Sequence, residues 1–361
     1  MNILQMIFSI EKGGAETYLY NVLDNLKEEI SFHVICDHEG SAHTKLVDRC
    51  DDVSIIRMRN VFDMRAARRI AAYCRDEEID IVQTHFLREN YIAVLAKLFN
   101  PDIRIIWTIH LIQENNGIVR FFNRIFSRFV DRIICVSRAV EDSLVKEGIS
   151  RNKTQVIYNG VDTDYFKAGD SSIREELSIS EDALLLTTVS RFNRDKGHDF
   201  LIDVLDELKN HMENFKVMLV GDGEEKHFIQ RKVEKYGLEN HVIFLGHRED
   251  IPEILSATDI YISPSEMEAI SFSILEALSC GKPVMATEVG GVPEIFEKGD
   301  CGKLVPFGDV KTFAKAIVDL YNNRSEYKSI KSNCRGIVEQ NFSQTNMIQE
   351  TYNLYGKLNL K

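Results

Sequence analysis

The chain has 361 residues, of which 44% are hydrophobic and 28% charged, and its formal net charge is −12. A chain of this length fits two domains, each large enough to bury a full core without disulfides or metals. The acidic balance excludes a general nucleic-acid-binding protein, because such proteins need a basic surface. No apolar stretch approaches the ~20 residues that span a bilayer, and the N-terminus lacks the basic and apolar regions of a signal peptide. These features predict a cytoplasmic protein that does not bind nucleic acid.

Cysteine and histidine spacing argues against disulfides and metal sites. The seven cysteines are odd in number, scattered along the chain and free of CxxC pairs. The ten histidines form no HxxxH pair and no cluster with cysteine. We therefore expect free thiols in a reducing compartment, with no bound metal or other cofactor.

Short apolar runs rich in β-branched residues alternate with longer amphipathic segments along the chain. In the first half, the runs that predict strands are residues 3–8, 32–36, 53–56, 79–82, 104–109 and 132–136. In the second half, they are residues 184–189, 216–220, 242–244, 260–262 and 283–286. Helical periodicity falls between them, as in residues 17–26, 200–209 and 272–278. Near-continuous apolar strands separated by helices indicate parallel sheets that are covered on both faces.

Two such units in tandem predict an α/β protein of two doubly wound, Rossmann-like domains. The junction is expected near residues 159–165, which precede a polar segment. This division gives an N-terminal domain over residues 1–165 and a C-terminal domain over residues 166–343. Ligands of open α/β sheets bind at the carboxyl ends of the strands, so we expect a site in a cleft where the two domains face each other.

Two strand-to-helix turns offer groups that could bind phosphate. Gly13 and Gly14 follow the first strand, where free backbone N–H groups could meet an anion, although a plain tight turn explains them equally well. Arg191 and Lys196 follow the strand at residues 184–189, where two converging cations suit a diphosphate. The alternative for this second segment is a solvated basic loop. Neither turn has the GxGxxG spacing of a dinucleotide site, so a nicotinamide cofactor is not expected.

The segment 263–283 carries two glutamates eight residues apart. Glu276 is predicted to lie about one turn inside a helix that begins near Ser271, and Glu268 in the loop before that helix. A helix N-terminus suits a phosphate, and a carboxylate on either side could accept hydrogen bonds from sugar hydroxyls. Spacing alone equally allows one glutamate that stabilises the helix dipole and one that faces solvent.

This segment resembles the Glu-x7-Glu motif of retaining glycosyltransferases of family 4, which have the GT-B fold. Further landmarks follow in family order and extend the resemblance over nearly the whole chain. They are Gly13 to Glu16, Thr108 to His110, Cys135 to Ser137, Asn159 to Asp162, Ser190 to Gly197, Gly221 to Gly223 and Gly290 to Glu294. The resemblance implies a hexosyltransferase-type enzyme of bacterial surface-polysaccharide synthesis.

The resemblance assigns a nucleotide-sugar donor to the C-terminal domain. Arg191 and Lys196 would hold the diphosphate and stabilise the leaving group. Glu276 would bind the ribose hydroxyls, and Glu268 would hold hydroxyls of the transferred sugar. The backbone N–H groups that would meet the sugar and phosphate belong to Ile270, Ser271 and Phe272. The family often has Gly-Phe-Gly where residues 269–271 read Ala-Ile-Ser, so the identity of the sugar stays open.

The resemblance assigns the acceptor to the N-terminal domain. Gly13 and Gly14 would close over the donor diphosphate from that side. His110 matches a histidine near the reacting sugar. The last helix, at about residues 344–358, would pack back onto the N-terminal domain.

The chemistry that fits these residues is front-face transfer, in which the leaving phosphate helps to deprotonate the acceptor. Fixed cations aimed at the charge that grows on the diphosphate supply the main catalytic effect. His110 as a general base, or simply as a strand-end histidine, is the alternative for that residue. The DxD at residues 162–164 resembles the metal motif of another glycosyltransferase fold but lies in the interdomain segment, so no metal is predicted.

Fifteen of the 22 arginines lie in residues 1–165. Arg120, Arg124, Arg128 and Arg132 recur every four residues among phenylalanines, which predicts a basic amphipathic helix over residues 120–132. Such a helix can lie on an anionic membrane, which would place the protein peripherally on the inner face of the cell membrane. An ordinary surface helix with its phenylalanines in the core is an equal alternative.

The combined interpretation is a metal-independent retaining glycosyltransferase. It would move a sugar from a nucleotide-diphosphate sugar, with UDP expected from its frequency in the family, to a glycan or lipid-linked acceptor. Two alternatives stay open: a nucleotide-sugar epimerase of the same fold, and a non-catalytic subunit that binds a glycan or a nucleotide.

Overall fold

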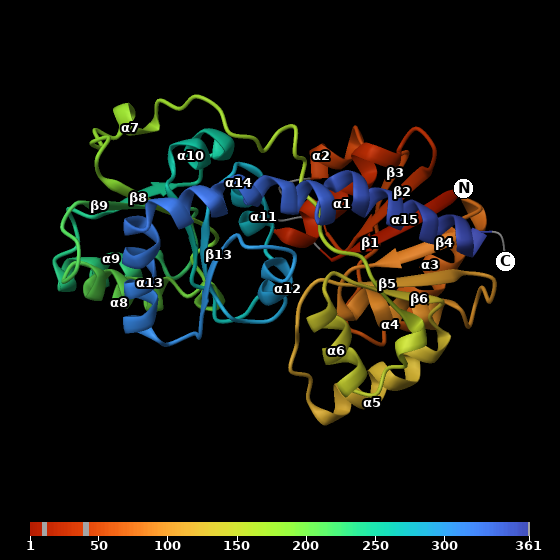
Figure 1. Ribbon diagram of the computed structural model, residues 1–361. Helices are drawn as coiled ribbons and strands as arrows, with labels where there is room; N and C mark the ends of the chain where they lie inside the picture. The colour runs from red at the N-terminus through yellow and green to blue at the C-terminus, as the bar shows by residue number, and fades with distance from the viewer. Residues whose placement is uncertain (9–12, 39–42, 360–361) are drawn as a thin grey trace. The chain divides into compact units, whose positions relative to one another are not determined.

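The computed structural model, drawn in Figure 1, describes residues 1–8, 13–38 and 43–359. The chain forms two compact units. Unit 1 comprises Met1–Asn159 and Thr345–Lys361, and unit 2 comprises Gly160–Gln344. Each unit is built on a parallel sheet with helices packed on both faces, the arrangement that near-continuous apolar strands predict.

Unit 1 contains a seven-stranded sheet with the strand order β3-β2-β1-β4-β5-β6-β7. Its strands are β1 (Asn2–Ile7), β2 (Ser31–Cys36), β3 (Asp52–Ile55), β4 (Ile81–Thr84), β5 (Arg104–Ile109), β6 (Arg132–Cys135) and β7 (Thr154–Val156). The strand order reverses between β1 and β4, where Ile3 pairs with Phe32 on one side and Ile81 on the other. In doubly wound sheets, ligands bind beside such a reversal at the carboxyl ends of the strands.

The helices of unit 1 connect these strands and cover the sheet. They are α1 (Gly14–Leu26), α2 (His43–Val47), α3 (Met64–Asp76), α4 (Leu87–Ala96), α5 (Gly117–Phe126), α6 (Arg138–Lys146) and the 3-10 turns η1 (Ser127–Phe129) and η2 (Arg151–Lys153). The last helix, α15 (Gln344–Asn359), also packs on this sheet. Its fully buried Tyr355 donates a hydrogen bond to Gln83 of β4 and accepts one from Gln5 of β1.

Unit 2 contains a six-stranded sheet with the order β10-β9-β8-β11-β12-β13. Its strands are β8 (Leu184–Val189), β9 (Phe215–Val220), β10 (Val242–Gly246), β11 (Ile260–Ser263), β12 (Val284–Thr287) and β13 (Gly302–Val305). Its helices are α7 (Ile173–Glu176), α8 (His198–Leu208), α9 (Lys226–Tyr236), α10 (Ile251–Ala257), α11 (Phe272–Ser279), α12 (Val292–Phe296), α13 (Val310–Asn322), α14 (Arg324–Asn341) and the 3-10 turn η3 (Arg194–Lys196). The order reverses between β8 and β11, so the carboxyl ends of these two strands mark the expected ligand edge.

The single helix predicted over residues 120–132 is wrong. Helix α5 ends at Phe126, the turn η1 follows, and Arg132 opens strand β6 opposite Ile106 of β5. The Asp131 carboxylate accepts hydrogen bonds from the Ile105 N–H and from Lys97, which fixes the start of β6. Sheet pairing therefore prevails over the four-residue spacing of the arginines.

All seven cysteines are free, and all but Cys50 are buried. Across residues 1–8, 13–38 and 43–359, no helix is both long enough and apolar enough to span a bilayer. Within these same ranges, no three His, Cys, Asp or Glu side chains gather in a way that could hold a metal ion.

Candidate active site

The loop after β8 carries the two predicted phosphate-binding cations. Phe192, which is fully buried and stacks on His198 with ring centroids 4.2 Å apart, anchors this loop to unit 2. Arg191, next to it, is exposed, and its guanidinium has no ion-pair partner in the described part of the chain. A cation held at the carboxyl end of a central strand without a protein partner is available to an anionic ligand.

The loops after β8 and β11 lie so close together that only glycine fits at position 197. Gly197 has φ 67°, and a Cβ there would lie 1.9 Å from the Pro264 carbonyl oxygen. The backbone N–H of Glu266 also donates to the Asp195 carbonyl at 2.8 Å. These contacts bring the segment with Lys196 against the segment with Glu268.

Lys196 and Glu268 form an ion pair at the junction of these two loops. The Lys196 Nζ atom donates to Glu268 Oε2 at 2.5 Å, and the Glu268 side chain is only 10% exposed. The structure thus joins two residues that are 72 positions apart in the chain. The Lys196 ammonium holds the Glu268 carboxylate beside the segment that leads into α11.

Helix α11 begins at Phe272, shortly after Glu268, and presents its N-terminus to the same region. Ser271 is the N-cap, and its hydroxyl accepts a hydrogen bond from the Ile274 N–H. Ile270 is buried and Phe272 is partly exposed, so side-chain packing fixes the backbone of this segment. The first N–H groups of a helix that lack intrahelical partners suit an anion.

Glu276 lies one turn further along α11. Its carboxylate has no hydrogen-bond or ion-pair partner among the residues that the structure describes. Burial by the surrounding protein raises the pKa of Glu276 to about 7. A carboxylate in this position can accept hydrogen bonds from two vicinal hydroxyls, and such bonds favour its ionised form.

Tyr261, which was not predicted from the sequence, lies on β11 beside β8 at this site. Its hydroxyl donates to the Val189 carbonyl and accepts from the Val189 N–H, both at 3.2 Å, so it fixes the end of β8 just before Arg191. Burial raises the pKa of Tyr261, and the nearby carboxylates of Glu276 and Glu268 add to that effect. In the sequence, Tyr261 looks like one more apolar strand residue, because only the pairing of β11 with β8 brings its hydroxyl to this edge.

The predicted residues of unit 1 lie at the carboxyl ends of its own strands. Gly13 is the extended N-cap of α1, and its carbonyl accepts a hydrogen bond from the Thr17 N–H at 3.0 Å. Gly14 is the first residue of that helix. The preceding part of the predicted turn, residues 9–12, lies outside the described residues.

His110 follows β5 and contacts a second histidine, His85, which follows β4. The two rings stack with centroids 5.3 Å apart, and His85 Nδ1 lies 3.0 Å from His110 Nε2. His85 Nε2 lies 2.9 Å from the Gln5 carbonyl oxygen Oε1. His85 was not predicted from the sequence, although it follows an apolar strand in the same way as His110.

This chain of contacts fixes the position of each ring proton. Gln5 Oε1 can only accept, so His85 Nε2 carries a hydrogen atom. Burial lowers the pKa of His85 and lowers that of His110 to about 3, so both rings are neutral. His85 Nδ1 must then accept from the His110 Nε2–H group, which leaves His110 Nδ1 without a hydrogen atom. That buried nitrogen has no hydrogen-bond partner among the residues that the structure describes.

Comparisons with known proteins identify the family of the chain. Residues 12–165 match the family described as "Glycosyltransferase Family 4", and residues 170–336 match "Glycosyl transferases group 1". The chain therefore belongs to family 4 of the glycosyltransferases and is a transferase enzyme, as the sequence predicted. The two matched regions correspond closely to the two Rossmann-like units.

Individual relatives show the same relationship. The N-acetyl-α-D-glucosaminyl L-malate synthase of Bacillus anthracis is 28% identical over 309 residues, which cover 81% of this chain and 79% of that protein. The UDP-Gal:α-D-GlcNAc-diphosphoundecaprenol α-1,3-galactosyltransferase of Escherichia coli is 23% identical, over 91% of this chain and 89% of its own. The crystal structure of Anabaena HepE in complex with UDP is 25% identical, covers 99% of this chain and 100% of its own, and has a TM-score of 0.89.

Proposed function

We propose that the protein transfers a sugar from a UDP-sugar to a hydroxyl of a glycan or lipid-linked acceptor in surface-polysaccharide synthesis, with retention of the anomeric configuration. The observation that carries the proposal is the cluster in unit 2 at the ends of β8 and β11. It comprises the Lys196–Glu268 ion pair together with Arg191 and Glu276, whose charged groups have no partner among the described residues. The UDP complex of HepE and the UDP-galactose donor named for the Escherichia coli relative support UDP.

Each residue of this cluster has a distinct chemical task in the proposal. Arg191 and Lys196 hold the diphosphate and stabilise the negative charge that grows on it as the bond from the sugar carbon to oxygen breaks. Glu276 accepts hydrogen bonds from the ribose, and Glu268 accepts them from hydroxyls of the sugar. The acceptor oxygen bonds to the same face of the sugar, and its proton passes to the departing diphosphate. No metal takes part in this proposal.

A product analysis tests this function against its alternatives. The protein is incubated in EDTA with a UDP-sugar, with and without a GlcNAc-diphosphoundecaprenol acceptor, and products are identified by NMR. We expect UDP release and an α-linked product that depend on the acceptor. Conversion of the UDP-sugar into its epimer without an acceptor would show an epimerase. Nucleotide binding with no turnover of any donor would show a non-catalytic binding subunit.

The raised pKa of Glu276 predicts a pH dependence of donor binding. Ribose hydroxyls donate hydrogen bonds to the ionised Glu276 carboxylate. Below about pH 7 the carboxyl group is protonated, and it must lose that proton before the donor binds. The Kd for the UDP-sugar should rise by up to tenfold for each pH unit below about 7 and stay constant above it. Calorimetry with UDP-glucose measures this directly, because its diphosphate has no ionisation in that range. Glu276→Gln should bind more weakly and lose the pH dependence; a Glu276→Gln profile equal to wild type would contradict the assignment.

We further propose that an anionic membrane surface is a partner of unit 1, through α5 and the turn η1. Three large apolar side chains are exposed there: Ile118 by 71%, Phe121 by 59% and Phe129 by 55%. Arg124 and Arg128 are exposed beside them and have no ion pair to a described residue. Apolar side chains next to free arginines suit the boundary between acyl chains and anionic headgroups.

Cosedimentation with liposomes tests this partner. Wild type should sediment with vesicles that contain phosphatidylglycerol at low salt and stay in solution with neutral phosphatidylcholine vesicles. Phe121→Ser combined with Arg124→Ser should reduce sedimentation several-fold, because each basic residue contributes about 1 kcal/mol near such a surface. Phe228→Ser, which removes an exposed phenylalanine of unit 2, is the matched control. Equal sedimentation of all three proteins would overturn the assignment.

A further inference from the structure

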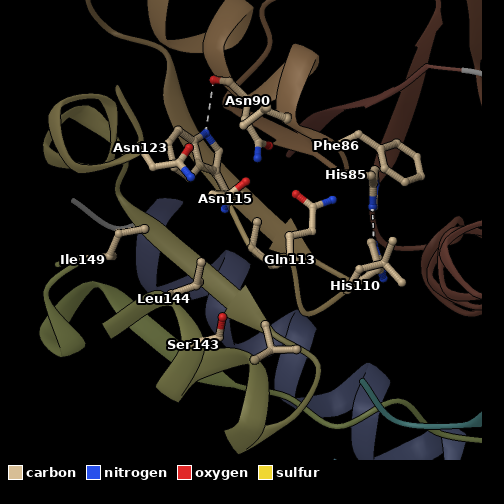
Figure 2. Close-up of a pocket in the computed structure, with 15 residues that line it drawn as sticks. His85, Phe86, Asn90, His110, Gln113, Asn115, Asn123, Ser143, Leu144 and Ile149 are labelled. Carbon is tan, nitrogen blue, oxygen red and sulfur yellow. Dashed lines mark hydrogen bonds between the residues drawn. The ribbon is translucent and has the colours of Figure 1, made fainter. Parts of the chain in front are cut away.

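Unit 1 contains a hollow that none of the charged donor-site residues lines (Figure 2). It lies between the ends of β4 and β5, the segment after β5 and helices α4, α5 and α6, and spans about 600 Å³ of space, open solvent included. Because His85 and His110 line it, the hollow lies at the carboxyl edge of the sheet, where ligands of open α/β sheets bind.

Part of the lining of the hollow is apolar. Trp107, Ile109, Leu144 and Ile149 line it, and the indole N–H of Trp107 is bonded to the Asn90 carbonyl oxygen at 3.2 Å. The indole therefore offers its apolar atoms and leaves no polar atom unpaired. An aromatic ring beside aliphatic side chains suits the apolar face of a sugar ring.

Polar groups without a partner in the described part of the chain also line the hollow. Asn90 is only 3% exposed; its Oδ1 accepts from Thr84, which leaves its Nδ2 group to point into the hollow (Figure 2). The Gln113 amide and the Ser143 hydroxyl also have no partner among the described residues. Asn115 donates to Glu147 at 3.0 Å, which leaves its Oδ1 free to accept. Donors and acceptors thus lie side by side, as hydroxyl groups require, since each hydroxyl both donates and accepts.

No charged side chain lines the hollow in the described part of the chain. Glu147 does not line the hollow; its carboxylate accepts a hydrogen bond from Asn115 and pairs with Arg120 at 3.7 Å. A phosphate, carboxylate or ammonium group that entered the hollow would lose its water without gaining a counter-charge, which is strongly unfavourable. The wall chemistry therefore selects an uncharged ligand.

From these observations, we propose that the hollow binds an uncharged sugar ring, or a similar polyhydroxyl ring, of the acceptor. The proposal rests on the proposed function, because the charged residues assigned to the donor belong to unit 2 and the hollow belongs to unit 1. It extends that function by naming the acceptor group as neutral and hydroxyl-rich. An acidic acceptor, such as the malate named for the Bacillus anthracis relative, does not fit this lining.

The test compares binding of small probes to the full-length protein and its variants. Saturation-transfer NMR measures methyl glucoside, methyl galactoside and methyl N-acetylglucosaminide as neutral probes, with L-malate and glucose 6-phosphate as acidic ones. Ser143→Trp fills the hollow from α6, and Gln113→Ala removes one exposed amide from its rim. Lys146→Trp adds the same indole to an exposed position of α6 outside the hollow and is the matched control.

We expect at least one neutral glycoside to bind and neither acidic probe to compete with it. Ser143→Trp should abolish that binding, Gln113→Ala should weaken it roughly fivefold to tenfold, as expected for one lost hydrogen bond, and Lys146→Trp should leave it unchanged. Binding of acidic probes alone, or neutral binding that survives Ser143→Trp and Gln113→Ala, would overturn the proposal. UDP affinity is measured in parallel: its absence in wild type would reject the donor assignment while the glycoside result still stands by itself.

Discussion

Replacing Arg191 with alanine is expected to lower kcat by roughly 10²–10³-fold, the loss seen when one fixed group that stabilises transition-state charge is removed. The reason is that Arg191 is the exposed cation at the end of β8 with no ion pair to a described residue, so its full charge is available to the departing diphosphate. The measurement is UDP release at saturating donor and acceptor. Arg191→Lys should recover only part of the rate, because an ammonium lacks the planar fork of guanidinium.

The matched control is Arg194→Ala, which removes another exposed arginine from the same loop. Its kcat should remain within about twofold of wild type, as for a surface substitution outside the site. The same large loss in both variants would show a general effect of charge or loop structure. A rise in KM at unchanged kcat for Arg191→Ala would show that this residue only binds the donor.

The second large effect is expected from the Lys196–Glu268 ion pair. Lys196→Ala should lower kcat by about 10²-fold, through loss of a cation near the leaving group. It should also lower the free energy of unfolding by about 1–3 kcal/mol, because it leaves the 10%-exposed Glu268 carboxylate without its partner. Chemical denaturation and steady-state kinetics measure the two effects separately.

The double variant Lys196→Ala/Glu268→Gln separates the structural role of the pair from its chemical role. Glutamine carries no charge, so the double variant should regain much of the stability that Lys196→Ala loses, with a coupling of about 0.5–3 kcal/mol. It should not regain activity, because both proposed contacts to the donor are gone. Additive stability losses would show that the pair contributes little, and recovered activity would exclude the two residues from the transfer step.

The sheets were predictable from the sequence because their strands are apolar almost without interruption. Residues 104–109 and 184–189 form strands with the predicted bounds, since burial on both faces leaves a continuous hydrophobic run. Strands β7 and β13 were not predicted. They are short, they lie at the edges of their sheets, and their sequences mix polar residues or glycine with few apolar ones.

The basic helix shows where periodicity alone misleads. Four arginines at four-residue spacing predict one face of a helix. The helix nevertheless ends before Arg132, because Asp131 and the pairing of β6 with β5 start a strand there. The exposure of Phe121 and Phe129 was also not predictable, because the same phenylalanines fit a buried face equally well. Which face of α5 packs on unit 1 is decided by tertiary contacts.

The candidate site was predictable only as separate segments. Strand ends and the spacing of Glu268 and Glu276 predicted groups at the carboxyl ends of β8 and β11, yet nothing in the sequence joined Lys196 to Glu268. The contact between His85 and His110, and the role of Gln5 in fixing their protons, depend equally on strands that lie far apart in the chain. Such pairs arise from strand order, which local patterns do not specify.

The most direct test of the central assignment, a nucleoside-diphosphate site in unit 2, is a thermal-shift panel of UDP, GDP, ADP, CMP and NAD in EDTA, on wild type and Arg191→Ala. A ligand at about 100 times its Kd should stabilise the protein by about 2.7 kcal/mol. We predict a shift with UDP that persists in EDTA and is lost or strongly reduced in Arg191→Ala. No shift with any nucleoside diphosphate, or a UDP shift of equal size in Arg191→Ala, would contradict the assignment.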